Sequence, residues 1–213
     1  HKAISKSSVE GAGFINIFIN KNYISEEVEK VLKYNEEWGK KKLKKERVLV
    51  EFVSSNPTGP LHIGHARGAV LGNIISNLLS NQGYEVTKEY YVNDAGRQIN
   101  ILALSIILET FQNNINKEGL YQGDYIKDLA KKFMAAQLVN EVNNPLEKFS
   151  DDPDERIDQL ISHYKKDSPE TWNLIRDFSV NEMIKLIKDD LSRMEILHDE
   201  CFYASSLGSI EKN

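Results

Sequence analysis

The sequence is poor in cysteine. Cys201 is the single cysteine among 213 residues, so the chain can form neither an internal disulfide nor a metal site built from cysteines. A reducing, cytoplasmic setting is therefore expected. The chain also lacks any apolar run long enough to cross a bilayer, and no basic–apolar–small signal segment stands at its amino end. These absences predict a protein without a membrane partner.

An excess of positive charge is absent as well. Lysine and arginine number 27 against 32 aspartates and glutamates, giving a net charge of -5. This balance argues against a general nucleic-acid coat protein, although a local basic patch could still grip one RNA. Lys40-Lys-Lys-Leu-Lys-Lys45 is a candidate patch. Alternatively, these lysines close a helix whose first turn carries Glu26 and Glu27, matching the helix macrodipole at both ends.

Against these absences stands one informative segment, Ser55-Asn-Pro-Thr-Gly-Pro-Leu-His-Ile-Gly-His65. It follows an apolar run and leads into a helical pattern. Helix N-termini present unpaired backbone N–H groups and the positive end of the macrodipole, so they attract phosphate. His62 and His65 add side-chain donors, and Gly64 lets a base or ribose approach the backbone. The segment therefore predicts a nucleotide-binding loop.

The hydrophobic pattern around this loop predicts an α/β fold. Residues 48–53 form a nearly continuous apolar run typical of a buried parallel strand. A 3.6-residue apolar stripe predicts a helix over 65–82, with Gly83 just past its end. A second strand is expected at 85–92 and a second helix at 97–111. This β-α-β-α order is typical of a Rossmann-like parallel sheet.

The regions on either side have different patterns. Weak alternation predicts a strand over 11–19, without an evident partner, and Ser25 is an acceptable N-cap for a helix over 25–45. Beyond residue 113 strand signals fade. Helices are expected over 125–139, over 155–165 and from Pro169 onward, so this half is predicted to be a mainly helical insertion.

The loop and its neighbours together resemble arginyl-tRNA synthetases of class I. The resemblance rests on Glu51-Phe-Val-Ser-Ser-Asn56, on the loop with Ala66-Arg67-Gly68, and on Tyr90-Tyr-Val-Asn-Asp-Ala-Gly-Arg-Gln98. It is close over about residues 46–108. A His-x-Gly-His tetrad alone also marks small-molecule nucleotidyltransferases. The resemblance implies activation of arginine with ATP to arginyl-adenylate and its transfer to tRNA(Arg). Magnesium would arrive with ATP, and a monomer is expected.

The resemblance also implies roles for particular side chains. The catalytic pair would be His62 and His65, stabilising charge on the ATP phosphates without acting as nucleophiles. The arginine and acceptor-end contacts would come from both loops. The ATP-binding residues would be Pro57, Gly59, His62, Gly64 and His65, and the substrate-binding residues would be Glu51, Ser54, Asn56, Asn93, Asp94, Gly96 and Gln98.

Plainer interpretations remain open for several of these residues. Glu51 could be a strand-end residue paired with a lysine. The segment from Asn93 to Gln98 could be an Asx turn that caps the next helix. Arg67 could orient the loop or only face solvent. His163 and His198 show no metal-ligand spacing, so both are interpreted as structural or exposed, and no metal site is predicted.

Two departures from the family pattern shape the predicted organisation. Gly59 stands where many arginyl enzymes carry a lysine, three residues before the first motif histidine, and no Lys-Met-Ser-Lys-like segment is present. The chain is therefore expected to be incomplete. We predict a remnant of an N-terminal domain (1–24), a linker helix (25–45), the first catalytic half (46–119) and a helical insertion (120–213). The alternatives are a small nucleotidyltransferase and a non-catalytic tRNA-binding paralogue.

Overall fold

The computed structural model describes residues 2–111, 115–136 and 149–208. The chain divides into two compact units, one formed by His1–Glu46 with Leu78–Glu85 and the other by Arg47–Asn77 with Val86–Asn213. Each unit is described by itself. None of the described helices is long and apolar enough to cross a membrane.

The first unit opens with a β-hairpin. Strand β1 (Ile4–Glu10) pairs antiparallel with β2 (Phe14–Ile19), and Gly11 and Gly13 supply positive φ values in the turn. The prediction of a strand over 11–19 is confirmed from Phe14 onward, but the expectation that it lacks a partner is wrong. The partner was missed because β1, Ile-Ser-Lys-Ser-Ser-Val-Glu, is mostly polar and carries little strand signal.

The helix predicted over 25–45 has different bounds. Helix α1 spans Lys21–Tyr34, and its N-cap is Asn20, whose side chain accepts a hydrogen bond from the backbone of Asn22. Ser25 lies inside the helix and donates to the carbonyl of Lys21. Asn35, with φ of 49°, ends α1 and begins the short helix η1 (Asn35–Glu37). Lys40–Lys45 therefore lie outside any helix, and the idea that they close one is wrong.

Gly83 shows why a glycine ends the helix after the nucleotide-binding loop. Its φ is +90°, and an added Cβ would lie 2.2 Å from the carbonyl oxygen of Lys42. The segment of Lys41 to Lys44 runs alongside this helix end, since Lys41 donates to Asn81 O and Lys44 donates to Gly83 O. Both the left-handed backbone and this close approach exclude a larger residue.

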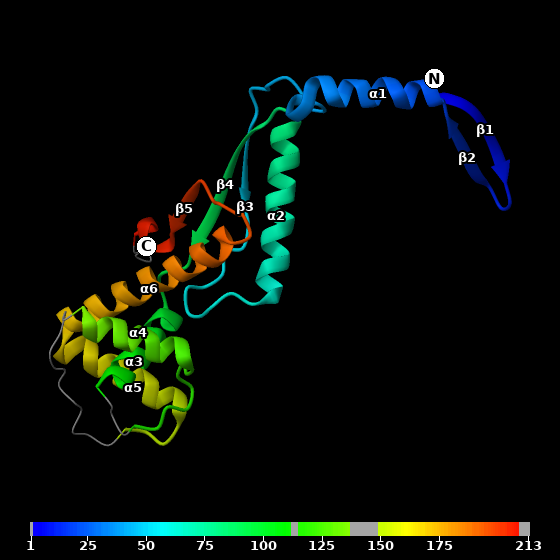
Figure 1. The fold of residues 1–213 in the computed structure, drawn as a ribbon. Coiled ribbons are helices and arrows are strands. Elements are labelled where there is room, and N and C mark those ends of the chain that lie inside the picture. Colours follow the sequence, from blue (N-terminus) through cyan, green and yellow to red (C-terminus); the bar gives the residue numbers. More distant parts are fainter. Residues whose placement is uncertain (1, 112–114, 137–148, 209–213) are drawn as a thin grey trace, which may run out of the picture. The chain divides into compact units, whose positions relative to one another are not determined.

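The second unit contains a three-stranded sheet in the order β3–β4–β5, drawn in Figure 1. Its strands are β3 (Arg47–Glu51), β4 (Glu85–Val92) and β5 (Glu200–Tyr203). Strands β4 and β5 are parallel, and the ladder between β3 and β4 advances in the same direction on both strands. The predicted parallel α/β sheet is confirmed, with β4 at the bounds expected for it.

Two sheet predictions need correction. Strand β3 is not buried on both faces, because Leu49 is 56% exposed and burial alternates along the strand. Strand β5 falls inside the segment predicted to be a helical insertion through residue 213, so that insertion ends before Glu200. Four residues, Glu-Cys-Phe-Tyr, are too few to show a strand pattern in the sequence.

Helix α2 (Ile63–Asn81) lies beside the sheet in both ribbon views. It packs closely because Phe52, just past β3, fills the space over Gly72. An added Cβ at that glycine would lie 2.2 Å from the Phe52 ring. Glycine is therefore required at this contact between helix and strand end, and the contact fixes where the loop between them begins.

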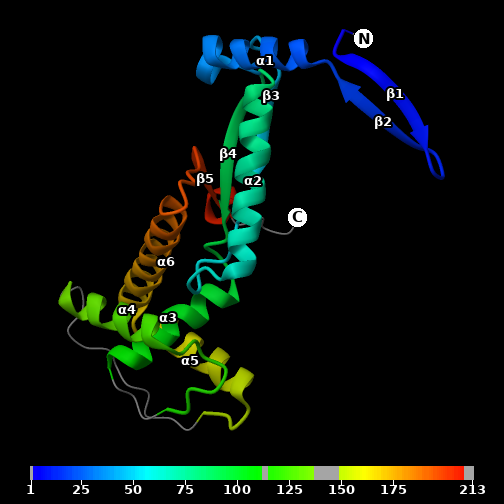
Figure 2. The same cartoon turned by 45° about the vertical axis from the view of Figure 1, so that its right-hand side comes forward.

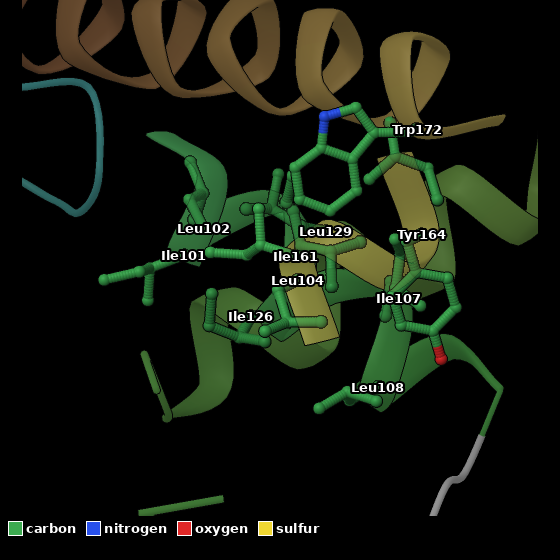
Figure 3. Packing of buried hydrophobic residues seen from close by; sticks show 14 of the residues in the cluster. Ile101, Leu102, Leu104, Ile107, Leu108, Ile126, Leu129, Ile161, Tyr164 and Trp172 are labelled. Atoms are coloured by element: carbon green, nitrogen blue, oxygen red, sulfur yellow. The ribbon is translucent and has the colours of Figure 1, made fainter. Parts of the chain in front are cut away.

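Four further helices form the main hydrophobic core. They are α3 (Arg97–Thr110), α4 (Asp124–Ala135), α5 (Pro153–Asp167) and α6 (Pro169–Ser192). Figure 3 shows Trp172 and Tyr164 packed with side chains from the other helices of this cluster. The predicted helices are confirmed, with α5 starting earlier because Asp152 caps it. Residues 137–139 of the predicted 125–139 helix lie outside the described residues. After β5, the short helix η2 (Ala204–Leu207) follows.

Candidate active site at the carboxyl edge of the sheet

The chain turns sharply where β3 ends. Val53 and Ser54 have φ values of 68° and 42°, in the left-handed region that β-branched residues seldom occupy. Such conformations cost about 1–3 kcal/mol each and persist where the surroundings impose them. Ser54 Oγ accepts a hydrogen bond from the backbone N–H of Tyr91, 3.1 Å away. The predicted substrate residue Ser54 therefore also attaches this turn to β4.

A buried tyrosine holds the next residue. The hydroxyl of Tyr90 donates to the carbonyl of Ser55 at 2.9 Å, and Ser55 Oγ lies 2.7 Å from the same hydroxyl. Because the phenol has one hydrogen, Ser55 donates in the second bond. Burial raises the pKa of Tyr90, which keeps the phenol protonated. Sequence reasoning assigned Tyr90 no role, although a tyrosine in a buried strand requires a polar partner.

Three amide side chains from the two loops meet at this edge. Asn56 Nδ2 donates to Gln98 Oε1 at 2.7 Å, and Asn93 Nδ2 donates to Asn56 Oδ1 at 3.2 Å. We call these three residues the amide cluster. The carboxyl ends of neighbouring parallel strands lie at the same sheet edge, which is why residues 37 to 42 positions apart come together here. The structure thus brings together three of the predicted substrate residues.

Asp94 has a different position from the one predicted. Its carboxylate accepts hydrogen bonds from the backbone N–H and the hydroxyl of Ser205, in η2. Its backbone carbonyl accepts from Arg176 Nη2 at 3.0 Å. Gly96, with φ of 92°, is the N-cap of α3 and offers no side chain, so the interpretation of this segment as an Asx turn capping that helix is wrong. Asp94 fastens the loop to η2 and α6.

The two motif histidines stack at the amino end of α2. Their ring centroids are 3.8 Å apart with 24° between the planes. His62 Nδ1 accepts from the Gly64 N–H at 3.1 Å, and His65 Nδ1 accepts from the His62 N–H at 3.3 Å. In a neutral imidazole that accepts at Nδ1, the proton resides on Nε2. Desolvation, and then the charge of His62, lower the pKa of His65, so its ring is neutral near pH 7.

This arrangement corrects the reason given for phosphate binding. The N–H groups of His62 and Gly64 are bound by imidazole nitrogens, and those of His65 and Ala66 are bound by the His62 carbonyl. The helix end therefore satisfies its own amides, and the donors left for an anion are the Nε2–H groups. Gly64 is needed because an added Cβ would lie 2.9 Å from His62 Cε1, not because a base must reach the backbone.

Glu51 ends β3 with an exposed side chain. Within the described residues its carboxylate takes part in no ion pair, so the interpretation of a strand-end glutamate paired with a lysine is not supported there. The strand alternation turns Glu51 away from the face that buries Phe52. It is an unneutralised anion one turn of chain away from the amide cluster.

A tyrosine from the helical core supports the loop at its middle. Tyr125 Oη donates to the carbonyl of Thr58 at 3.1 Å. The same ring lies beside Gly59, where an added Cβ would be 3.8 Å from the hydroxyl, an ordinary contact. Pro57 is buried, so the predicted ATP residues Pro57 and Gly59 belong to a fastened part of the loop. Sequence reasoning did not identify Tyr125, and no local pattern marks it.

The remaining histidines have structural surroundings, as expected. His198 packs on Phe52 with ring centroids 4.3 Å apart, and its Nε2 lies 3.2 Å from the Phe52 carbonyl. Burial lowers its pKa. His163 lies 3.0 Å from the carboxylate of Asp167. In the described part of the chain, no group of three or more histidine, cysteine, aspartate or glutamate side chains could hold a metal ion. Arg67 is exposed.

Comparison with known proteins agrees with this geometry. Residues 27–213 match the model of the catalytic domain of class I tRNA synthetases (R). The chain is 37% identical to the arginine–tRNA ligases of Vesicomyosocius okutanii and Nitrosospira multiformis, over 96% of its own length in each case. It spans only 37% of the length of each of these relatives.

Solved structures show the same likeness. A Campylobacter jejuni protein assigned as an arginyl tRNA synthetase shares 34% identity and a TM-score of 0.66, covering 89% of this chain and 38% of that one. The Thermus thermophilus arginyl-tRNA synthetase, at 20% identity and a TM-score of 0.56, shares the fold. On the match of the family model to most of its length, the chain belongs to the arginyl family of class I tRNA synthetase catalytic domains.

Proposed function

We propose that this chain is the first half of the catalytic domain of an arginine–tRNA ligase. The enzyme would activate arginine with ATP to arginyl-adenylate and transfer the arginyl group to tRNA(Arg). The observation that carries the proposal is the stacked histidine pair, whose Nδ1 atoms both accept hydrogen bonds from the backbone. Relatives named arginine–tRNA ligase cover almost the whole chain and support the same reaction.

The histidine geometry suits adenylate formation. The arginine carboxylate would attack the α-phosphorus of ATP, forming a new O–P bond as the bond to the pyrophosphate oxygen breaks. Negative charge on the phosphate oxygens is best stabilised by fixed donors that need no reorganisation. The Nε2–H groups of His62 and His65 are such donors, because the backbone holds the opposite ring nitrogens. Neither histidine has to take up a proton or act as a nucleophile.

The residues at this edge fit the substrates in kind. The exposed Glu51 carboxylate would pair with the arginine guanidinium, and Ser54 and Asn56 would line the same pocket. Asn93, Gly96 and Gln98 would contact substrate or the acceptor end of tRNA. Asp94 would act only through the loop it holds. The loop of residues 55–65 carries no carboxylate, so it suits phosphate, and Mg2+ would enter with ATP.

The proposed setting is the cytoplasm. The single cysteine suits a reducing compartment. The proposed assembly state is a monomer. Neither proposal affects the assignment of the reaction.

Exchange of pyrophosphate into ATP tests the proposal. It should be measured on the full-length protein with saturating tRNA(Arg), and should depend on arginine and on no other amino acid. Exchange driven by a phosphorylated metabolite would instead identify a small-molecule nucleotidyltransferase. Binding of tRNA without exchange would identify a non-catalytic paralogue. Either result would overturn the proposed function.

A further inference from the structure

A cavity of about 310 Å3 lies beside the loop that follows β4. It is separate from the histidine loop and is formed where the first turn of α3 faces the end of α5 and the start of α6. The residues used in the argument are Gly96, Asn100, Lys165, Trp172, Asn173 and Arg176. None of them was assigned a role by the sequence except Gly96.

The lining of this cavity is cationic in an acidic chain. No carboxylate lines it, whereas Lys165 and Arg176 both do. Within the described residues neither cation forms an ion pair. The chain as a whole carries a net charge of -5, so a concave surface with two unneutralised cations is not an average sample of it. Such a surface favours an anion.

The nearest carboxylates on the flanking elements are engaged elsewhere. Asp94 is bound by Ser205. Asp154 and Asp158, on α5, are bound by Arg97 at 2.9 Å and 3.0 Å. Asp177 follows Arg176 but lines a neighbouring cavity. The field inside the cavity is therefore not cancelled by these groups.

The donors in the cavity are held in position. Arg176 spends one N–H on the Asp94 carbonyl, at 3.0 Å, and a guanidinium has five, so further donors remain. The Lys165 ammonium lies 5.8 Å from the centroid of the buried Trp172 ring. Asn100 and Asn173 add amide N–H groups. Two cations and two amides form the donor set that a phosphate group needs.

The location selects the source of that phosphate. Gly96 lines the cavity and stands two residues before Gln98 of the amide cluster, so the cavity continues the predicted substrate edge. ATP already has its own donors on the other loop. We propose that this cavity binds a backbone phosphate of the tRNA acceptor end, through Lys165 and Arg176. This inference rests on the proposed function.

The test compares two adjacent lysines in the full-length protein. Lys165 and Lys166 both lie in the last turn of α5, so both interact equally with its macrodipole, but Lys166 lines a different cavity. Lys165→Gln should weaken tRNA(Arg) binding by about three- to fivefold at physiological salt and reduce the salt slope by about 0.7. Lys166→Gln should change neither. Thermal unfolding of both variants checks that they fold.

Three outcomes would overturn the inference. The first is tRNA binding by Lys165→Gln with the wild-type affinity and slope. The second is an equal loss in Lys166→Gln, which would indicate only the general field of the helix end. The third is a rise in the Michaelis constant for ATP, or weaker inhibition by pyrophosphate, with tRNA binding intact, because the anion would then be free. Absence of arginine-dependent exchange in the wild type would instead refute the proposed function, and the tRNA-binding comparison would still stand.

Discussion

The start of α2 and the body of α3 follow neighbouring strands yet have opposite surroundings. Helix α2 buries Ala69, Gly72 and Ser76, while the histidines at its amino end meet solvent or each other. Every residue of α3 from Ile101 to Leu108 is buried among α4, α5 and α6. Side chains at the first helix are fixed by hydrogen bonds and those of the second by packing. We therefore expect changes in the loop to affect chemistry and changes in α3 to affect stability.

The largest effect should come from removing both imidazole donors. The double variant His62→Asn, His65→Ala should lower arginine-dependent pyrophosphate exchange by about 100- to 1000-fold, or about 3–4 kcal/mol of transition-state stabilisation. Asparagine can still accept from the Gly64 N–H, so the helix cap survives and thermal unfolding should change little. A rate within about threefold of wild type would refute the role of the pair.

The reverse pattern is expected in α3. Leu104 is fully buried, and Leu104→Ala should reduce the free energy of unfolding of the 213-residue chain by about 3 kcal/mol. The matched control is Leu71→Ala on α2, where the side chain is 59% exposed, with an expected change below about 0.5 kcal/mol. Urea unfolding measures both. Equal losses would show that the two helices do not differ in the way described.

A smaller effect is expected at Glu51. Glu51→Gln keeps the shape of the side chain and removes its charge, so the Michaelis constant for arginine should rise by an amount equivalent to about 1.5–3 kcal/mol. The constant for ATP should stay close to that of the wild type. Steady-state exchange at varied arginine and varied ATP separates the two. Equal weakening of both substrates would place Glu51 in the scaffold.

The smallest effect concerns the link between the two regions. Tyr125→Phe removes only the hydrogen bond to the Thr58 carbonyl and should cost about 1 kcal/mol in urea unfolding of the chain. Tyr121→Phe is the control, because within the described residues the Tyr121 hydroxyl forms no hydrogen bond. If the two variants unfold alike, the bond from the core to the loop contributes nothing measurable.

The elements that sequence could predict are those with a complete local pattern. Strand β4 and helix α3 have the expected bounds because apolar periodicity and flanking glycines mark both ends. Helix α1 ends early, since Asn35 adopts a left-handed conformation that no lysine run reveals. Strands β1 and β5 are defined by their partners rather than by composition.

The site follows the same division. Sequence could predict that Asn56, Asn93 and Gln98 belong to one edge, because strand ends converge in a parallel sheet. It could not predict that Asp94 is consumed by Ser205, since that bond joins residues 111 positions apart. Nor could it show that the imidazoles cap their own helix, which depends on ring orientation rather than on spacing.

The bond between Asp94 and Ser205 also has a consequence for the order of folding. Together with the bond from Lys88 to Asp199, it closes a segment of about 110 residues. Closing so long a flexible loop costs about 4 kcal/mol of chain entropy beyond a constant. Helices α3 to α6 lie inside that segment, so their prior assembly shortens the span that remains to be closed. During synthesis, the loop after β4 would thus acquire its final anchor only once residue 205 has left the ribosome.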